Sequence, residues 1–319
     1  MNKFTVLVTA LHLTEQAQAI LRDAGAEIVF MPEPITEETL IAQLQTVPIH
    51  AILLRGGRPI TARVLAASPH LKLIAKNGAG VDSVDLDAAK QLGIAVRVAR
   101  GANADAVAEH AIAMMLALTR NLAGLDAKVK SGGWEGMAYQ GRDFRGSVVG
   151  IVGYGAIGKS TAHLARALGA RVLVHRLSNG AGAADDFEIE PSFAALLTRI
   201  DILSLHCPLT EQTRGLVDRA ELQSMKQGSL LINTARGGIV DEVALVEALQ
   251  DGAYKRLAGA GLDTLAHEPI EPNHPLLKMN NVILTPHVAG VTAEAALAVS
   301  TMTVKNITEF FNARHSPNT

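Results

Sequence analysis

Cysteine is almost absent from this chain of 319 residues, in which Cys207 is the single example. One cysteine excludes an internal disulfide framework and is typical of a reducing compartment. Aromatic residues make up only 3% of the chain, so the core must rely on Ala, Val, Leu and Ile. The sequence also lacks an apolar run long enough for a membrane span or a signal peptide. We therefore expect a cytoplasmic protein.

An excess of charge of either sign is also absent. Lys and Arg total 29 against 31 acidic residues, which gives a formal net charge of −2. This balance lacks the excess of positive charge typical of a protein that binds nucleic acid or an anionic membrane. We also predict no metal site. A hydrophobic content of 48% and a charged content of 19% are typical of a globular protein, and the length predicts two domains.

Short apolar runs alternate with amphipathic stretches, a pattern typical of βαβ units and a mostly parallel sheet. Helical patterns occur early in the chain, with Thr14 and Thr36 as expected N-caps. A first block has expected strands at residues 4–9, 27–30, 51–54, 71–75 and 94–98. One long Ala-rich helix is expected at 104–130. A second block then has expected strands at 148–152, 171–175, 200–205, 229–233, 258–262 and 282–284.

The last amphipathic stretch, 292–311, predicts a helix that folds back onto the first block. The second block would then be an insertion within the first. We expect a substrate-binding domain formed by residues 1–99 and 289–319, and a cofactor-binding domain formed by residues 100–288. A cleft between two such α/β domains is a usual place for a cofactor and a substrate.

The most specific motif is Gly-Tyr-Gly-Ala-Ile-Gly at residues 153–158, directly after the apolar run 148–152. In a dinucleotide site, Gly153 would allow the tight turn, Gly155 the approach of the pyrophosphate, and Gly158 close packing of helix on strand. The pyrophosphate would lie on exposed N–H groups at the helix N-terminus, where the helix dipole favours negative charge. A purely structural turn would not require this spacing of small residues, so we predict a nicotinamide cofactor.

The end of the next expected strand, 171–175, bears on the choice between NAD and NADP. An NAD enzyme usually has an acid there, which hydrogen-bonds the adenosine ribose. Here Arg176 follows the strand, Leu177, Ser178 and Asn179 come next, and the first acid is Asp185. A guanidinium beside a hydroxyl and an amide suits a 2′-phosphate. We predict NADP as the preferred cofactor, with NAD as the alternative if Arg176 is only a surface cation.

Four polar residues lie at or just after expected strand ends in the second block: Arg236, Asp263, Glu268 and His287. Hydride transfer to a ketone requires a proton for the developing alkoxide and a cation for the substrate carboxylate. His287 can supply the proton, Glu268 can fix its tautomer, and Arg236 can hold the carboxylate and polarise the carbonyl. For each of these residues taken alone, the alternative is an ordinary solvated residue in a surface loop or turn. Together, downstream of a dinucleotide motif, they predict a reductase of 2-oxo acids.

Six ordered motifs resemble the D-isomer-specific 2-hydroxyacid dehydrogenases over essentially the whole chain, at residues 78–85, 153–158, 206–210, 233–241, 261–269 and 285–290. The fold expected is α/β, with two doubly wound parallel-sheet domains: a Rossmann cofactor domain inserted into a flavodoxin-like substrate domain. The resemblance implies a catalytic triad of Arg236, Glu268 and His287, acting on a small substrate of the glyoxylate or hydroxypyruvate type. The alternatives are an enzyme similar to D-3-phosphoglycerate dehydrogenase, or a non-catalytic NAD(P)-sensing protein similar to the corepressors of this fold.

The resemblance also implies ligand contacts. The loop after strand 71–75 would receive the substrate carboxylate, and the implied substrate contacts are Arg55, Ala79, Gly80, Arg236 and His287. Arg55 and Arg58 resemble a loop of phosphoglycerate dehydrogenases and would bind a second anion, or are simply solvated. With the residues argued above from the glycine motif and the strand end at 175, the expected cofactor contacts are Gly153, Tyr154, Gly155, Ala156, Ile157, Gly158, Arg176, Ser178, Cys207, Pro208, Thr234, Ala235, Asp263, His287 and Gly290. The chain departs from the family at Arg176, where NAD-using members carry an acid. A homodimer is also implied, with the helix at 104–130 as a surface for it.

Overall fold

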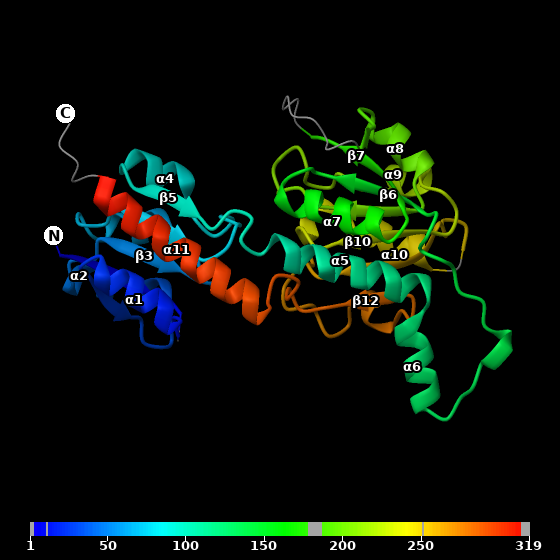
Figure 1. Cartoon of the computed structure of the whole chain (residues 1–319), viewed down its shortest axis with the longest axis horizontal. Coiled ribbons are helices and arrows are strands. Elements are labelled where there is room, and N and C mark those ends of the chain that lie inside the picture. The colour runs from blue at the N-terminus through cyan, green and yellow to red at the C-terminus, as the bar shows by residue number, and fades with distance from the viewer. Residues whose placement is uncertain (1–2, 11, 178–186, 251, 314–319) are drawn as a thin grey trace. The chain divides into compact units, whose positions relative to one another are not determined.

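The computed structural model describes residues 3–10, 12–177, 187–250 and 252–313 (Figure 1). The chain divides into two compact units: unit 1 comprises Met1–Asn103 and Thr292–Thr319, and unit 2 comprises Ala104–Val291. Each unit is built on one parallel sheet, so the predicted fold class is confirmed. No helix in the described part of the chain is both long and apolar enough to cross a membrane.

Unit 1 contains a five-stranded parallel sheet in the order β2-β1-β3-β4-β5. This order is flavodoxin-like, with its topological switch point between β1 and β3. Both faces are covered by helices, and therefore β1 and β3 are buried along their whole length. The strands are β1 (Phe4–Val8), β2 (Ala26–Phe30), β3 (Ala51–Leu54), β4 (Leu73–Lys76) and β5 (Ala95–Val98).

Alternate residues of these strands point to opposite faces of the sheet and enter two separate cores. One core packs against α1 and α11, where Phe311 stacks on Phe4 with ring centroids 4.3 Å apart. The other core packs against α2, α3 and α4. Thr14 and Thr36 are N-caps as expected, accepting hydrogen bonds from backbone N–H groups of the first turn. The helices are α1 (Glu15–Asp23), α2 (Glu37–Thr46), α3 (Ala62–Ala66), α4 (Leu86–Gln91) and α11 (Ala293–Ala313).

Unit 2 contains a seven-stranded parallel sheet in the order β12-β11-β10-β9-β6-β7-β8. This is the Rossmann order with one further strand, and the switch point lies between β6 and β9. The strands are β6 (Val148–Val152), β7 (Arg171–His175), β8 (Glu188–Ile189), β9 (Ile202–Leu205), β10 (Ser229–Asn233), β11 (Leu257–Leu262) and β12 (Val282–Leu284).

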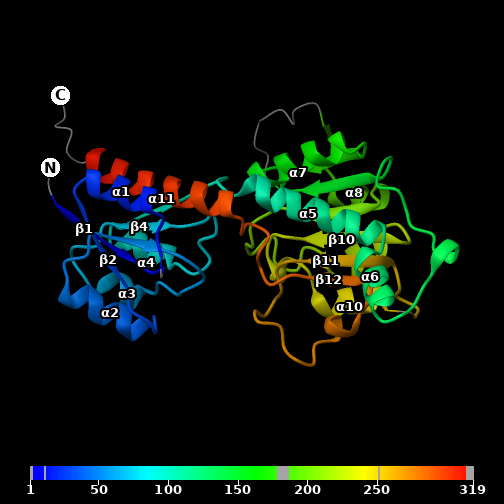
Figure 2. The same ribbon diagram turned by 60° about the horizontal axis from the view of Figure 1, so that its bottom comes forward.

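The helices of unit 2 cover both faces of its sheet (Figure 2). Residues of α5 and α7 share one core with Val149 and Ile151 of β6, while α8, α9 and α10 share the other core with Leu203 and Leu231. The helices are α5 (Ala104–Thr119), α6 (Leu122–Lys130), α7 (Ala156–Ala167), α8 (Phe193–Arg199), α9 (Arg219–Ser224) and α10 (Glu242–Leu249). Three 3₁₀ turns are η1 (Gly136–Ala138), η2 (Gly237–Ile239) and η3 (Pro275–Lys278).

The expectation of one long helix at 104–130 is wrong. The chain leaves α5 at Thr119 and starts α6 at Leu122, and between them Asn121 adopts the left-handed conformation with φ of 46°. Asparagine tolerates this conformation better than most residues do. The N–H group of Arg142 donates to the carbonyl oxygen of Thr119 at 2.9 Å, which satisfies a helix-end acceptor from a distant segment. The Ala- and Leu-rich composition continues through the break, so the pattern does not reveal it.

Candidate active site

The predicted site residues of unit 2 lie along one edge of its sheet. All seven strands are parallel, so their carboxyl ends share this edge, which borders the ligand crevice in doubly wound folds. The residues that follow the strand ends are Gly153 after β6, Arg176 after β7, Cys207 after β9, Arg236 after β10, Asp263 after β11 and His287 after β12. Parallel topology therefore brings residues far apart in sequence to the same edge of the sheet.

His287 and Glu268 are in direct contact. The Nδ1 atom of His287 lies 2.8 Å from Oε2 of Glu268, and the other carboxylate oxygen accepts a hydrogen bond from the N–H of Leu265 at 3.0 Å. An ionised carboxylate can only accept, so Nδ1 carries the proton. In the neutral ring Nε2 is then the acceptor and the nitrogen available to a substrate. Both side chains are about half exposed, which allows a substrate to reach them.

The backbone at His287 is strained, and Asp263 holds it in place. His287 has φ of 56°, in the left-handed region that non-glycine residues rarely adopt. Its N–H donates to the carbonyl oxygen of Asp263 at 2.8 Å. The next two N–H groups, of Val288 and Ala289, donate to Oδ1 and Oδ2 of Asp263 at 2.8 and 2.9 Å. The segment that carries His287 therefore wraps around one buried carboxylate, whereas a contact of Asp263 with the cofactor stays a prediction.

Arg236 is half-buried and held by its neighbours. Its Nη1 donates to the carbonyl oxygen of Ala235 at 2.7 Å, and its own carbonyl oxygen accepts from Nδ2 of Asn233 at 2.8 Å. Gly237 follows directly, and a Cβ atom at this position would overlap the backbone of Leu265. The loop that carries Arg236 thus lies against the loop that leads to Glu268.

Sequence reasoning missed two residues that support this region. Gly237 allows the close approach of the two loops, and the consecutive glycines after Arg236 were the signal for it. Glu242, at the start of α10, accepts a hydrogen bond from the N–H of Ala266 at 2.6 Å. The sequence gives Glu242 no distinguishing signal, because the contact spans 24 positions in the chain.

The glycine motif has the geometry that a dinucleotide requires. Gly153 has φ of 90°, and a Cβ there would lie 2.7 Å from the carbonyl oxygen of His206. A Cβ at Gly158 would overlap the carbonyl oxygen of Gly153, so α7 packs closely on this turn. At Gly155 a Cβ would meet no atom of the described residues within 4 Å, and the backbone is open to a ligand. Gly155 and Ala156 are exposed, and Ile157 is half-buried. These residues fit a nicotinamide dinucleotide.

The turns that follow β9 and β10, next to the glycine motif, contain mostly buried residues. Burial raises the pKa of the Cys207 thiol to about 11, so it stays protonated and does not act as a nucleophile. Burial also lowers the pKa of His206 to about 3, so this imidazole is neutral. Pro208 is exposed, whereas Thr234 and Ala235 are buried. Within the described part of the chain, Oγ1 of Thr234 has no hydrogen-bond partner, as expected where a ligand completes a site.

Arg176 lies beside the glycine motif. Its guanidinium carbon is 5.5 Å from the centroid of the Tyr154 ring, within cation–π distance. The N–H of Gly153 donates to the carbonyl oxygen of His175 at 3.0 Å, which joins the end of β7 to the glycine turn. Ser178 and Asn179, which the sequence assigns to a 2′-phosphate, lie outside the described residues.

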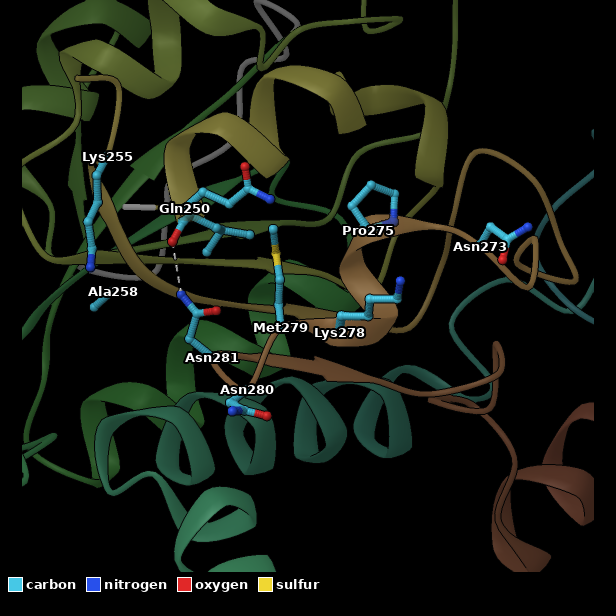
Figure 3. A pocket seen from close by; sticks show the side chains of 10 residues that line it. Gln250, Lys255, Ala258, Asn273, Pro275, Lys278, Met279, Asn280 and Asn281 are labelled. Atoms are coloured by element: carbon cyan, nitrogen blue, oxygen red, sulfur yellow. Dashed lines mark hydrogen bonds between the residues drawn. The ribbon is translucent and has the colours of Figure 1, made fainter. Parts of the chain in front are cut away.

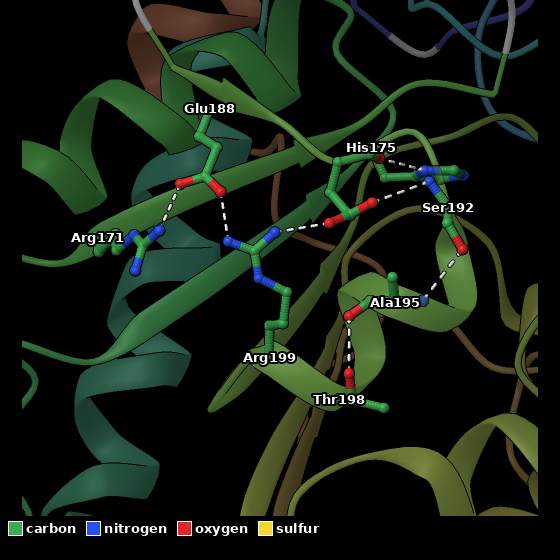
Figure 4. A network of polar contacts seen from close by, with 8 residues as sticks. Arg171, His175, Glu188, Ser192, Ala195, Thr198 and Arg199 are labelled. Carbon is green, nitrogen blue, oxygen red and sulfur yellow. Dashed lines mark hydrogen bonds and ion pairs between the residues drawn. The ribbon is translucent and has the colours of Figure 1, made fainter.

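A charged network holds β8 against β7 (Figure 4). Glu188 accepts hydrogen bonds from Arg171, at 2.5 Å, and from Arg199. These two guanidinium groups, Arg171 first, hold the pKa of Glu188 below its ordinary value. Arg199 also binds Glu190 at 2.6 Å, and the carbonyl oxygen of Glu190 lies 3.0 Å from Nδ1 of His175. The network therefore braces the strand end from which Arg176 follows. The two-residue β8 was not expected, because it contains no apolar run.

The predicted substrate residues Arg55, Ala79 and Gly80 belong to unit 1. Arg55 follows β3 at the switch point, and its N–H donates to Oγ1 of Thr9 at 3.0 Å. Ala79 is exposed and Gly80 half-buried. Lys76, which sequence reasoning missed, is buried and donates to the carbonyl oxygen of Gly56, next to Arg55.

Arg58, the other expected anion-binding residue, already has a carboxylate partner in the structure. Its Nη2 lies 3.1 Å from Oε1 of Glu33, and its Nη1 donates to the carbonyl oxygen of Arg55. An arginine already paired with a carboxylate is a weaker anion site, because a substrate anion would have to displace Glu33 or share the cation with it. Arg55 is therefore the stronger candidate of the two.

A cavity of about 650 Å³ lies at the other edge of the unit 2 sheet (Figure 3). It is lined by Leu249 and Gln250 at the end of α10, by Ala258 near the start of β11, and by residues before β12. The cavity lies at the amino ends of β11 and β12, whereas Asp263 and His287 follow the carboxyl ends of these strands. At about 3.3 Å per residue, the length of β11 separates the two edges by roughly 20 Å. The cavity is therefore not part of the candidate active site.

The chain is similar to known proteins in sequence and in structure. Residues 112–289 match the family model described as D-isomer specific 2-hydroxyacid dehydrogenase, NAD binding domain. The glyoxylate reductase of Aeropyrum pernix is 34% identical over 326 residues, which cover 100% of this chain and 96% of the relative. The D-3-phosphoglycerate dehydrogenase of Archaeoglobus fulgidus is 37% identical over 296 residues, which cover 92% of this chain. The chain spans only about half, 55%, of that relative.

The crystal structure of the TT0316 protein from Thermus thermophilus is similar over nearly the whole chain. The TM-score is 0.86, the sequence identity is 34%, and the alignment covers 99% of each chain. The similarity therefore extends over both units of the structure.

Proposed function

The chain belongs to the D-isomer-specific 2-hydroxyacid dehydrogenase family, and from this premise we propose that it is an NAD(P)H-dependent oxidoreductase. It would interconvert a small 2-oxo acid and the corresponding D-2-hydroxy acid. The observation that carries the proposal is the hydrogen bond of 2.8 Å between His287 and Glu268, on the sheet edge that also carries the glycine motif and Arg236. A proton donor, its carboxylate partner and a carboxylate-binding cation follow neighbouring strands there.

Arg236, His287 and Glu268 have separate roles in the proposed reaction. A dihydronicotinamide cofactor held at the glycine motif, residues 153–158, would supply the hydride. Arg236 holds the substrate carboxylate and polarises the carbonyl through charge-assisted hydrogen bonds. His287, as the imidazolium, transfers the Nε2 proton to the carbonyl oxygen as negative charge develops there, while Nδ1–H stays bonded to Glu268. In the reverse direction Nε2 accepts the hydroxyl proton, and the Glu268 carboxylate stabilises the imidazolium that forms.

We propose glyoxylate or hydroxypyruvate as the type of substrate. The support is the glyoxylate reductase of Aeropyrum pernix, which this chain matches over 96% of its length. An activity similar to that of D-3-phosphoglycerate dehydrogenase is the second candidate. The observation in its favour is the pair of cations at neighbouring strand ends in unit 1, Arg55 after β3 and Lys76 at the end of β4. A phosphate on the substrate would be the second anion for them.

Loss of NADPH and NADH absorbance with a panel of 2-oxo acids tests the proposal. We expect rapid oxidation of the reduced cofactor with glyoxylate or hydroxypyruvate as substrate. A marked preference for 3-phosphohydroxypyruvate would favour the second candidate. Tight cofactor binding without turnover on any member of the panel would overturn the enzymatic proposal in favour of a cofactor-sensing protein.

We propose NADP as the preferred cofactor, because Arg176 follows β7 where an NAD enzyme carries an acid. Arg176→Asp should weaken the binding of NADPH by about one to two orders of magnitude, since one charge-assisted hydrogen bond contributes roughly 1.5–3 kcal/mol. The new carboxylate would also repel a 2′-phosphate, whereas NADH should be affected less. Titration of both cofactors against wild type and variant gives the two ratios of dissociation constants.

Arg219→Asp is the matched control, because it makes the same change of charge on α9, where Arg219 pairs with Glu247 at 2.6 Å. It should leave the ratio unchanged. If wild type binds NADH as tightly as NADPH, or if Arg176→Asp leaves the ratio as it was, the enzyme must be assigned to NAD.

We also propose a homodimer that covers α6 and the segment after it. This region exposes Leu122, Val129 and Trp134 at 54%, 51% and 82%, and Met137 is fully exposed. Large apolar side chains gathered on one exposed segment are typical of a protein interface, and a second copy of the chain is the partner that the family implies. A cytoplasmic location is likewise proposed, with support from the single cysteine, which is buried and unpaired.

The double substitution Trp134→Ser with Met137→Ser should shift the protein from dimer towards monomer, measured by light scattering after size-exclusion chromatography. Each change removes apolar area from the proposed interface. Tyr254→Ser, at a side chain 52% exposed elsewhere on unit 2, should leave the mass unchanged. A wild-type protein that is monomeric at micromolar concentration would contradict the proposed dimer.

A further inference from the structure

His110 on α5 is hydrogen-bonded to the segment that carries His287, although 175 positions separate it from its partner. Its Nε2 lies 3.0 Å from Oγ1 of Thr285, and this hydroxyl donates to Oδ1 of Asp263 at 2.6 Å. The His110 side chain is 25% exposed and that of Asp263 only 1%. A continuous polar chain therefore runs from α5 to the carboxylate around which the His287 segment is wrapped.

The direction of each hydrogen bond in this chain follows from proton count. The hydroxyl of Thr285 has one proton, and an ionised carboxylate can only accept, so that proton is donated to Asp263. The hydroxyl oxygen must then accept from His110, which requires a proton on Nε2 of His110. His287 has the opposite arrangement, with the proton on Nδ1, which faces Glu268. The two imidazoles are thus held in different tautomers by their partners.

The buried carboxylate completes the connection to His287. Oδ1 of Asp263 accepts from both the Thr285 hydroxyl and the N–H of Val288, and Oδ2 accepts from Ala289. These bonds maintain the left-handed conformation of His287, which non-glycine residues rarely adopt. Without the Thr285 bond, the Asp263 carboxylate would accept fewer hydrogen bonds and gain freedom to rotate. The N–H bonds that hold the segment would weaken with it.

We propose that His110 is a positioning residue for His287. Its Nε2–H orients the Thr285 hydroxyl towards Asp263 and so fixes the turn that aims the His287 imidazole at the reacting carbonyl. The inference rests on the proposed function, because it assigns the proton transfer to His287. His110 itself acts only through Thr285 and Asp263, and its loss should lower kcat while leaving substrate KM and cofactor affinity nearly unchanged.

A double-mutant cycle separates this role from general packing on α5. His110→Ala and Thr285→Val should each lower kcat by about ten- to a hundredfold, because a misplacement of about 1 Å can cost that much. Since both changes break the same chain, the double variant should be no slower than the slower single variant. His110→Gln retains an N–H donor at similar reach and should restore most of the rate. Glu109→Ala, at an exposed neighbour on α5, is the control and should resemble wild type.

Amide hydrogen exchange at Val288 and Ala289 provides a readout that does not depend on activity. Exchange should be faster in His110→Ala and Thr285→Val, and should return towards the wild-type rate in His110→Gln. Unchanged exchange, a wild-type kcat in His110→Ala, or kcat losses that multiply in the double variant would overturn the positioning role. If wild type reduces none of the 2-oxo acids, the proposed function fails, and the exchange rates still decide whether His110 holds this turn.

Discussion

Replacement of His287 with alanine should lower kcat by about two to four orders of magnitude, the range typical of a positioned general acid. The change removes the group that protonates the developing alkoxide, so water would have to supply the proton. The dissociation constants of NADPH and NADH should change little, because His287 is only one of the expected cofactor contacts, and the glycine motif and Arg176 follow other strands, β6 and β7. Steady-state rates and cofactor titrations of the same preparation measure both quantities.

Two comparisons make this result specific. His70→Ala removes an exposed imidazole from unit 1 and should have wild-type kinetics. Glu268→Gln retains the size of the partner of His287 but not its charge, so it should be slower than wild type and faster than His287→Ala. A kcat for His287→Ala within a factor of a few of wild type would remove His287 from the mechanism.

Most of the fold could be predicted because parallel strands in α/β domains are apolar and separated by helices. Each expected strand is present, and each observed boundary lies within two residues of the expected one. The exceptions have local causes. β8 is two exposed residues held by Arg171 and Arg199, a contact that no apolar pattern encodes. The break at Asn121 depends on a single backbone angle and on a hydrogen bond from Arg142.

Some residues of the candidate site could also be predicted from the sequence, and others could not. The residues proposed for chemistry follow strand ends, and parallel topology gathers strand ends at one edge, so Arg236 and His287 could be named from the sequence. The groups that hold them could not. His110 and Glu242 reach the site from helices through single long-range hydrogen bonds, and neither has a motif or a spacing that marks it. Gly237 had a visible signal, but only the structure identifies the backbone of Leu265 as its neighbour.

Arg236→Lys should lower kcat/KM by about two to three orders of magnitude, although the charge is conserved, because the loss of one oriented donor to a developing charge costs roughly 2.7–4 kcal/mol. The guanidinium is held by the bond of 2.7 Å from Nη1 to the carbonyl of Ala235, which fixes the plane of its donors. A lysine ammonium places three donors on one nitrogen and cannot reproduce a planar fork for a carboxylate. Both kcat and KM should therefore worsen, since the contact exists in the bound substrate and strengthens in the transition state.

The control for this change is Arg219→Lys, which makes the same substitution in the exposed ion pair with Glu247 and should keep wild-type kinetics. Arg236→Ala adds a second test, because free guanidinium in the assay should restore part of its activity, whereas alkylammonium ions should not. Rescue by both ions would mean that positive charge alone suffices and that the planar fork is unimportant. If Arg236→Lys retains both turnover and substrate affinity, Arg236 is a structural cation that orders the loop beside Gly237, and the substrate carboxylate must be held by another group.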